Sequence, residues 1–197
     1  MNKRQQVKTF VGRKLTRFER NKENGSGKAE LAALRRGVGR RPGELPELTG
    51  TFLNEMPEEL MGHTDAPSSA EWAVYTALTL YALHQQGQNQ PMHLEGQKLG
   101  TAIRYLMPSG MPEDNPPILA RFNQMAASAD IAELAQHLRG IVTLLRANSI
   151  PLDYIDLADD LYRYQFEDNR NSLRLKWGRD FYRMPLNETD SKNNTEH

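Results

Sequence analysis

The sequence predicts an all-α protein made of two packed helical bundles. Three observations support this class. Apolar residues recur at helical spacing along most of the chain, several helix starts carry capping residues, and no segment alternates apolar and polar residues between hairpin turns. With 197 residues, the chain is long enough to bury one substantial core or two small ones.

The first 41 residues are predicted to form two basic helices. In residues 5–20 one helical face is apolar, comprising Val7, Phe10, Val11, Leu15 and Phe18. The other faces are expected to carry Lys8, Arg13, Lys14 and Arg17. Ser26 is a candidate cap for a second helix, which runs through Leu34 and stops in the glycine- and proline-rich segment 37–42.

A long irregular connection containing Pro42, Pro46, Pro57 and Pro67 is expected before a central helix. Ser68 and Glu71 form the capping-box pattern that begins this helix. The helix is apolar on more than one face, which is typical of a core position, through Trp72, Tyr75, Leu78, Leu80, Tyr81 and Leu83. A further helix through Leu99, Ile103 and Leu106 is predicted to end at Pro108.

The segment 108–117 contains four prolines and marks the predicted boundary between the two bundles. We therefore expect an N-terminal helical unit with a basic arm over residues 1–107 and a C-terminal helical bundle over residues 108–185. The polar residues 186–197 are expected to form a disordered tail.

Four helices are predicted in the C-terminal unit. The first begins with Asn115 as cap and Pro116 at its first position, and buries Ile118, Leu119, Phe122 and Met125. The second opens at Asp130 and Glu133 and buries Leu134, Leu138, Ile141, Val142 and Leu145. Asp153 caps the third, which turns Leu157, Leu161 and Tyr164 inward. The last begins near Asn169 and buries Leu173, Trp177 and Phe181.

The formal net charge of zero hides a strongly polarised chain. Residues 1–41 contain 13 Lys and Arg against 3 Asp and Glu, whereas the rest contains 12 against 22. The segment 34–46 alone concentrates Arg35, Arg36, Arg40 and Arg41 beside a helix stop. The planar guanidinium donates in pairs to phosphate oxygens, so this cluster predicts a polyanion-binding surface. A solvated basic helix end explains the pattern about equally well.

Patterns for catalysis and metal binding are missing from the sequence. The five histidines show no ligand spacing, and Gly37-Val-Gly39 lacks the strand and the lysine-serine of a phosphate-binding loop. Asp153, Asp156, Asp159 and Asp160 could hold a cation, but capping and a solvated face explain them better. We therefore expect no cofactor, no metal and no enzymatic activity.

The chain contains no cysteine, no apolar stretch of about 20 residues and no signal-peptide core. These features indicate a cytoplasmic protein that does not bind a membrane.

Two groups of residues resemble a known family. They are Leu34 to Pro46 near the start, and Ile150 to Tyr154, Leu157 to Tyr162 and Leu173 to Tyr182 near the end. Residues 98–102, 121–122, 138–139 and 144–146 follow in the same order as in that family. The sequence from about Ser26 to Arg183 is similar to the small subunit of the type I-E CRISPR Cascade complex, the CasB family.

The resemblance implies a two-part helical protein without catalytic activity, present in two copies beside the other Cascade subunits. Such a subunit helps to hold the hybrid of guide RNA and target DNA, and the displaced non-target strand, in antiviral defence. The positions that match basic residues of the family are Arg35, Arg36, Arg40, Arg121, Arg139, Arg146, Arg174, Lys176 and Arg179. Arg41 adjoins them, and Lys28 is added by charge alone. Some members of the family carry an arginine after Leu-Gly, where this chain has Gly100-Thr101. The resemblance therefore gives less support for a phosphate contact at this point.

Other interpretations stay open from the sequence. Trp72 and Trp177 could stack on bases, but core packing is favoured because both lie on apolar faces. Asp180 is the rival partner of Lys176 at a spacing of four residues. The whole chain could instead be a helix-turn-helix DNA-binding regulator, although the segment 37–46 is proline-rich for a tight turn, or a protein-binding helical scaffold.

Overall fold

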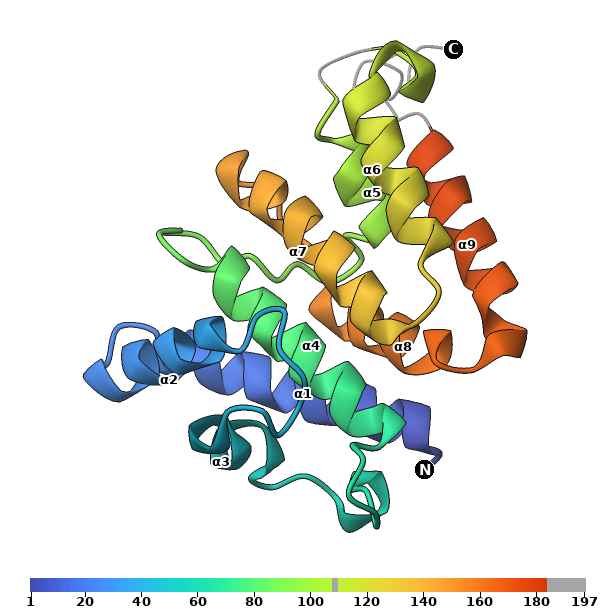
Figure 1. The fold of residues 1–197 in the computed structure, drawn as a ribbon. Helices are drawn as coiled ribbons and strands as arrows, with labels where there is room; N and C mark the ends of the chain where they lie inside the picture. Colours follow the sequence, from blue (N-terminus) through green and yellow to red (C-terminus); the bar gives the residue numbers. More distant parts are fainter. Residues whose placement is uncertain (108–109, 184–197) are drawn as a thin grey trace, which may run out of the picture.

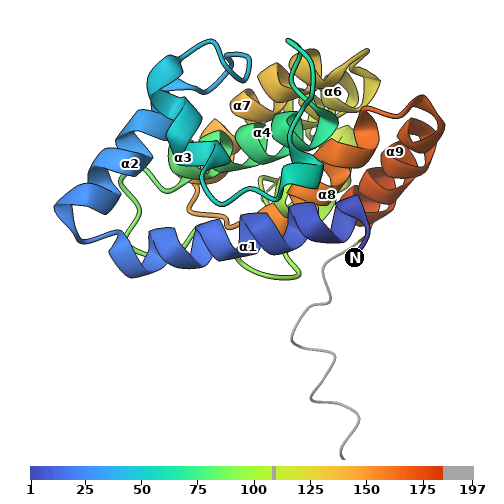
Figure 2. The same cartoon turned by 90° about the horizontal axis from the view of Figure 1, so that it is seen from below.

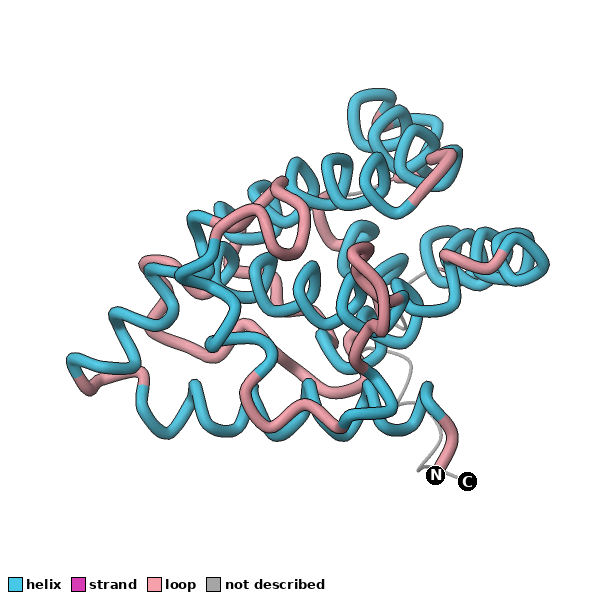
Figure 3. Tube along the Cα trace, turned by 60° about the horizontal axis from the view of Figure 1, so that its bottom comes forward, coloured by secondary structure: helices cyan, strands magenta, loops and turns pink. Residues whose placement is uncertain are grey.

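The structure, a computed structural model, describes residues 1–107 and 110–183 (Figure 1). The predicted tail from residue 186 and the predicted helix end at Pro108 lie outside this part. The described residues form α1 (Lys3–Asn21), α2 (Gly25–Arg36), α3 (Thr49–Leu53), α4 (Ser69–His84), α5 (Leu99–Arg104), α6 (Pro116–Ala127), α7 (Ile131–Ala147), α8 (Tyr154–Tyr164) and α9 (Glu167–Tyr182). Three short 3-10 helices complete the set, at Pro46–Leu48, Glu58–Leu60 and Pro112–Asp114. The prediction of an all-α protein is confirmed, and helices form most of the trace in Figure 3.

The central element is α4, which packs against α1, α2, α7 and α8 (Figure 1). Its capping box is present as predicted. The Ser68 hydroxyl accepts from the Glu71 N–H at 3.0 Å, and the Glu71 carboxylate accepts from the Ser68 N–H at 2.6 Å. Almost every side chain of α4 is buried, because neighbouring helices cover it on several sides. A helix that is apolar all round is stable in this setting.

The long helix α1 runs beneath α4 and α8 (Figure 2). Its predicted apolar face is buried, but the assignment of Lys14 to a polar face is wrong, because this side chain is only 2% exposed. Its Nζ donates to the Thr51 carbonyl at 3.1 Å and lies 5.3 Å from the centre of the Phe10 ring. Burial lowers the pKa of Lys14. The lysine thus joins α1 to α3 from inside the fold.

The predicted cap of α2 is also wrong. The N-cap is Asn24, not Ser26, since the helix already begins at Gly25. The turn between α1 and α2 is so tight that a Cβ atom on Gly27 would lie 2.1 Å from the Asn21 carbonyl oxygen. The segment that follows α2, expected to be irregular, contains α3 and two of the 3-10 helices. Helices this short contain too few turns to show a periodic pattern.

In the second half of the chain α5 packs against α9, and α6 packs against α7. Asp130 and Asp153 cap α7 and α8 as predicted, accepting from Glu133 N at 2.9 Å and Asp156 N at 3.0 Å. Asn115 occupies the N-cap of α6, and its side-chain amide donates to the Met111 carbonyl at 3.1 Å. Ile118 and Leu119 are half-buried rather than buried. Both residues still pack against the hydrophobic core.

Helices from both halves contribute to one continuous hydrophobic core. α8 packs against both α1 and α4, and the core includes Trp177, which is 1% exposed. Trp72 is 8% exposed, so both tryptophans take the core role that was favoured. The division of the chain at residue 108 stays a prediction. Among the described residues, each helix is too short or too polar to cross a membrane.

Candidate nucleic-acid interface

The C-terminal end of α2 and the outer side of α7 carry arginines that are distant in sequence and close in space. Burial lowers the pKa of Arg35, and the nearby charge of Arg146 lowers it further. Arg146 extends from the last turn of α7, and its Nη1 donates to the Gln86 amide oxygen at 2.9 Å. Arg35 and Gln86 line the same pocket, so the two like charges lie on the same part of the surface, with an amide rather than a carboxylate as the partner of Arg146.

The loop after α2 is fixed against α7. Gly39 has a φ of +79°, which favours glycine, and its carbonyl accepts from the Gln136 side chain at 2.9 Å. A Cβ atom on Gly39 would lie 3.4 Å from Nη1 of Arg139. The sequence folds this way because Gly37, the C-cap of α2, is buried beneath Tyr75, whose hydroxyl donates to the Gly37 carbonyl at 3.1 Å. The loop that follows Arg35 and Arg36 is thereby held against the α7 residues Gln136 and Arg139.

The exposed members of the cluster make only weak ion pairs. The Arg40 side chain is 51% exposed and meets Glu44 at 2.5 Å. The Arg36 side chain is 61% exposed, and its Nη2 lies 3.7 Å from Glu47. Exposed ion pairs contribute about 0–1 kcal/mol, so a phosphate can displace them at little cost. Arg41 instead lies over the Trp72 ring, 6.0 Å from its centre.

Lys28 and Arg35 line the same open pocket of about 230 Å³, together with the turn 85–88. The Lys28 side chain is 62% exposed and lies 3.5 Å from Glu23. We call the set formed by Lys28, Arg35, Arg36, Arg40, Arg139 and Arg146 the α2–α7 basic surface. It unites six of the eleven residues that the sequence proposed as nucleic-acid contacts.

Arg41, over Trp72, is also outside this set, and the other four predicted contacts lie on α6 and α9, at the other end of the molecule from α2 (Figure 1). Arg121 is exposed and donates to the Pro117 carbonyl at 3.1 Å, while Arg179 is exposed on α9. Arg174 donates through Nε to the Ala126 carbonyl at 2.6 Å, which ties α9 to the end of α6. The structure therefore does not bring these three residues into the α2–α7 basic surface.

Lys176 is engaged by two carboxylates of α8. Its Nζ donates to Asp156 Oδ2 at 2.8 Å and to Asp160 Oδ1 at 2.7 Å, so its carboxylate partners are on α8 and the rival partner Asp180 is not one of them. Asp180 lies 3.9 Å from Lys98 instead. The Asp160 carboxylate also accepts from the Trp177 indole at 2.7 Å. Burial raises the pKa of Asp160 to about 6, although the charge of Lys176 opposes this.

The acidic residues of α8 thus have structural partners. Asp153 caps the helix as expected, but a solvated face is wrong for Asp159 and Asp160, which are 4% and 1% exposed. Asp159 binds Arg4 at 2.6 Å, joining α8 to the start of α1. Within the described residues, no group of three or more His, Asp or Glu is placed to hold a metal ion.

Sequence reasoning missed the glutamines that position the basic surface. Gln86 binds the Arg146 guanidinium, Gln88 donates to the Arg146 carbonyl at 2.8 Å, and Gln136 holds the loop at Gly39. The only available signal was the repetition of glutamine in residues 85–90. Amides are neutral, so a search for charge did not find them.

The architecture defines a class: an all-helical protein that presents cations from two distant segments on one surface. Comparison with known families identifies it further, since the family model described as CRISPR-associated protein Cse2 matches residues 30–182. The chain belongs to the Cse2 family, which confirms the resemblance to CasB found in the sequence. No curated protein matches the sequence.

Solved structures agree with this assignment. CasB from Thermobifida fusca is 38% identical, with a TM-score of 0.77 over 90% of this chain and 98% of that chain. A Cse2-family CRISPR-associated protein from Thermus thermophilus is 25% identical, with a TM-score of 0.62 over 87% and 97% of the two chains. CasB from M. ruber is 24% identical, with a TM-score of 0.61 over 92% and 97%, and supports the fold.

Proposed function

We propose that this chain is the non-catalytic small subunit of an RNA-guided antiviral Cascade complex and that its α2–α7 basic surface binds the nucleic-acid backbone. In this role it stabilises the hybrid of guide RNA and target DNA and the displaced non-target strand. It acts in the cytoplasm, in two copies, beside the other Cascade subunits. Base pairing reads sequence in such a complex, so the small subunit needs to supply only shape and charge.

The observation that carries this proposal is the juxtaposition of Arg35 and Arg146. Bringing two guanidiniums together costs free energy, and burial of Arg35 increases that cost. A phosphate near the pair reduces the repulsion, and a planar guanidinium can donate to it in pairs. The surrounding Lys28, Arg36, Arg40 and Arg139 extend the same positive potential along the surface.

A helix-turn-helix regulator fits the geometry less well. The connection from α2 to α3 covers residues 37–48, whereas the motif joins its two helices through about three or four residues. Nucleic-acid contact by Arg121, Arg174, Lys176 and Arg179 stays a prediction. Of these, Lys176 would have to exchange two carboxylates for a phosphate.

The test is binding of a labelled single strand, and of the same sequence as duplex, across a salt series. For Arg35→Ala with Arg146→Ala, we expect weaker binding of the single strand. The slope of log affinity against log salt should flatten by about 1.4, since each lost phosphate contact removes about 0.7. The matched control is Lys8→Ala with Arg13→Ala, which removes two charges from α1.

Equal losses in the two double variants would show that total charge, and not this surface, determines binding. Unchanged affinity and slope in the Arg35 and Arg146 variant would remove the surface from the interface. Strong preference for one duplex sequence would favour a regulator, and no binding to any nucleic acid would favour a protein-binding scaffold.

A further inference from the structure

A second charge asymmetry lies between the arginine cluster and Lys98. Residues 42–97 contain eight Asp and Glu and no Lys or Arg. The first half of this stretch forms α3, two 3-10 helices and the connecting loops before α4. Glu44 and Glu47 pair with Arg40 and Arg36, but the other exposed carboxylates before α4 leave this surface net negative, so its favoured partner carries positive charge. They are Glu55, Glu58, Glu59 and Asp65.

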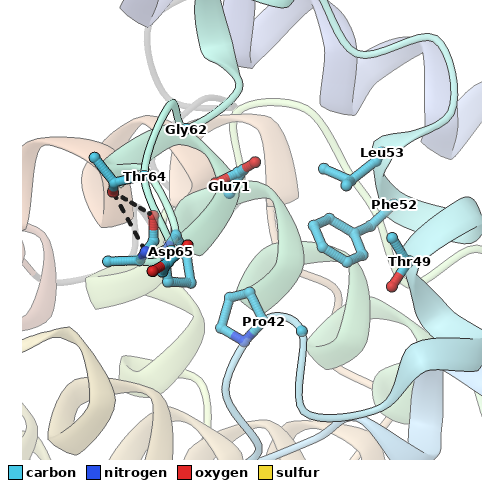
Figure 4. A pocket seen from close by; sticks show the side chains of 11 residues that line it. Pro42, Thr49, Phe52, Leu53, Gly62, Thr64, Asp65 and Glu71 are labelled. Atoms are coloured by element: carbon cyan, nitrogen blue, oxygen red, sulfur yellow. Dashed lines mark hydrogen bonds between the residues drawn. The ribbon is translucent and has the colours of Figure 1, made fainter.

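An open pocket of about 190 Å³ lies in this acidic segment, between α3 and the loop 62–67 (Figure 4). Phe52 and Leu53 form an apolar wall on one side, and Pro42 closes the bottom of the view. Asp65 and Glu71 lie on the opposite side. The pocket therefore combines an aromatic and aliphatic wall with carboxylates, and Asp65 is exposed to solvent.

The acidic side of the pocket is held in place by its own backbone contacts. The Glu71 carboxylate accepts from the Ser68 N–H at 2.6 Å, and the Thr64 hydroxyl accepts from the Ala66 N–H at 3.3 Å. Gly62 allows the loop to approach closely, because a Cβ atom there would lie 3.1 Å from Oε2 of Glu71. Little ordering is needed on binding, which lowers the entropic cost of occupying the pocket.

We propose that this pocket receives one arginine side chain from a basic segment of a protein partner. The volume suits a single side chain. Phe52 is only 3% exposed, so the methylene stem of the arginine can pack against the half-buried Leu53 while its fork meets the exposed Asp65 carboxylate. A lysine of equal charge lacks the planar fork and binds more weakly. The identification of the partner as another Cascade subunit rests on the proposed function, whereas the chemistry of the pocket does not.

The first test is direct binding of a fluorescent peptide with three arginines spaced by Gly and Ser, followed by anisotropy with the full chain. We expect Asp65→Lys to weaken binding at least tenfold. The matched control is Glu95→Lys, which makes the same charge change at an exposed position outside the pocket and should change affinity less than threefold. Equal losses in the two variants overturn the proposal, as does equal affinity for a peptide with three lysines.

The second test is incorporation into a complex reconstituted from the remaining Cascade subunits. Asp65→Lys should join the complex at least tenfold less tightly and still bind single-stranded DNA as the wild type does. Wild-type incorporation of this variant overturns the role of the pocket. If the unmodified chain itself does not join the subunits, the proposed function fails, and the peptide measurement still decides what the pocket binds.

Discussion

Replacement of Lys176 by methionine tests whether this residue is structural. The substitution keeps most of the side-chain volume but leaves Asp160, which is 1% exposed, without its cation. Breaking a buried ion pair by removing one partner costs about 3–5 kcal/mol. Because the Lys176 side chain is 26% exposed, we expect the lower end, about 3 kcal/mol.

The loss should depend on pH. In the wild type the Asp160 pKa is raised to about 6. The contribution of Asp160 to the free energy of unfolding is therefore complete below the pKa of the unfolded state and is lost as the pH rises to about 6. Without Lys176 the folded pKa of Asp160 rises further, and the loss continues above pH 6. The difference in unfolding free energy between wild type and variant should therefore grow by up to about 1.4 kcal/mol for each pH unit between 6 and 8.

Urea denaturation followed by circular dichroism at pH 6 and pH 8 measures both quantities. Arg179→Met is the control, since Arg179 is exposed on the same helix. A destabilisation below 1 kcal/mol with no pH dependence would refute the structural role of Lys176. Reduced DNA affinity at unchanged stability would instead assign the residue to the nucleic-acid interface.

Two further substitutions probe close packing and buried charge. Gly100→Ala should destabilise the fold by about 1–3 kcal/mol in thermal or urea melts, because its Cβ atom would lie 2.3 Å from the Trp177 carbonyl oxygen. Gly178→Ala, which meets open space, should be stabilising by about 0.5–1 kcal/mol, and a similar gain at Gly100 would contradict the packing argument. For Lys14→Met, the free energy of unfolding relative to that of the wild type should decline from pH 8 to pH 10.5. The wild type becomes more stable over this range, because the folded lysine, whose pKa is lowered, gives up its proton at a lower pH than the unfolded lysine does. A difference independent of pH would show that burial does not lower the pKa of Lys14.

Local signals predicted the long helices and the starts of α4, α7 and α8. Ser68, Asp130 and Asp153 bind the backbone N–H groups two or three residues ahead, so a short stretch of sequence contains the whole interaction. The five-residue helix α3 was missed because it has too few residues for periodicity. Its position is instead determined by packing against α4.

Partners across the fold could not be predicted from spacing along one helix. Lys176 has an acidic residue four positions ahead, yet its carboxylates come from α8, because the packing of α9 on α8 directs Nζ there. The same reason applies to Lys14, which the helical pattern placed on a polar face. For the candidate interface, the arginines around the helix stop were visible in the sequence, whereas the approach of Arg35 to Arg146 required the tertiary structure.

The contact between Arg4 and Asp159 has a consequence for biosynthesis. The two residues are separated by 155 positions, and the helices that carry them, α1 and α8, pack against each other. At a synthesis rate of about 5–20 residues per second, α1 leaves the ribosome roughly 8–30 s before its partner helix is made. During this interval the apolar residues Val7, Phe10 and Val11 lack part of their final cover. The nascent chain therefore has to delay completion of its core until most of it has been translated, and α1 is the segment most exposed to aggregation or to chaperones in the meantime.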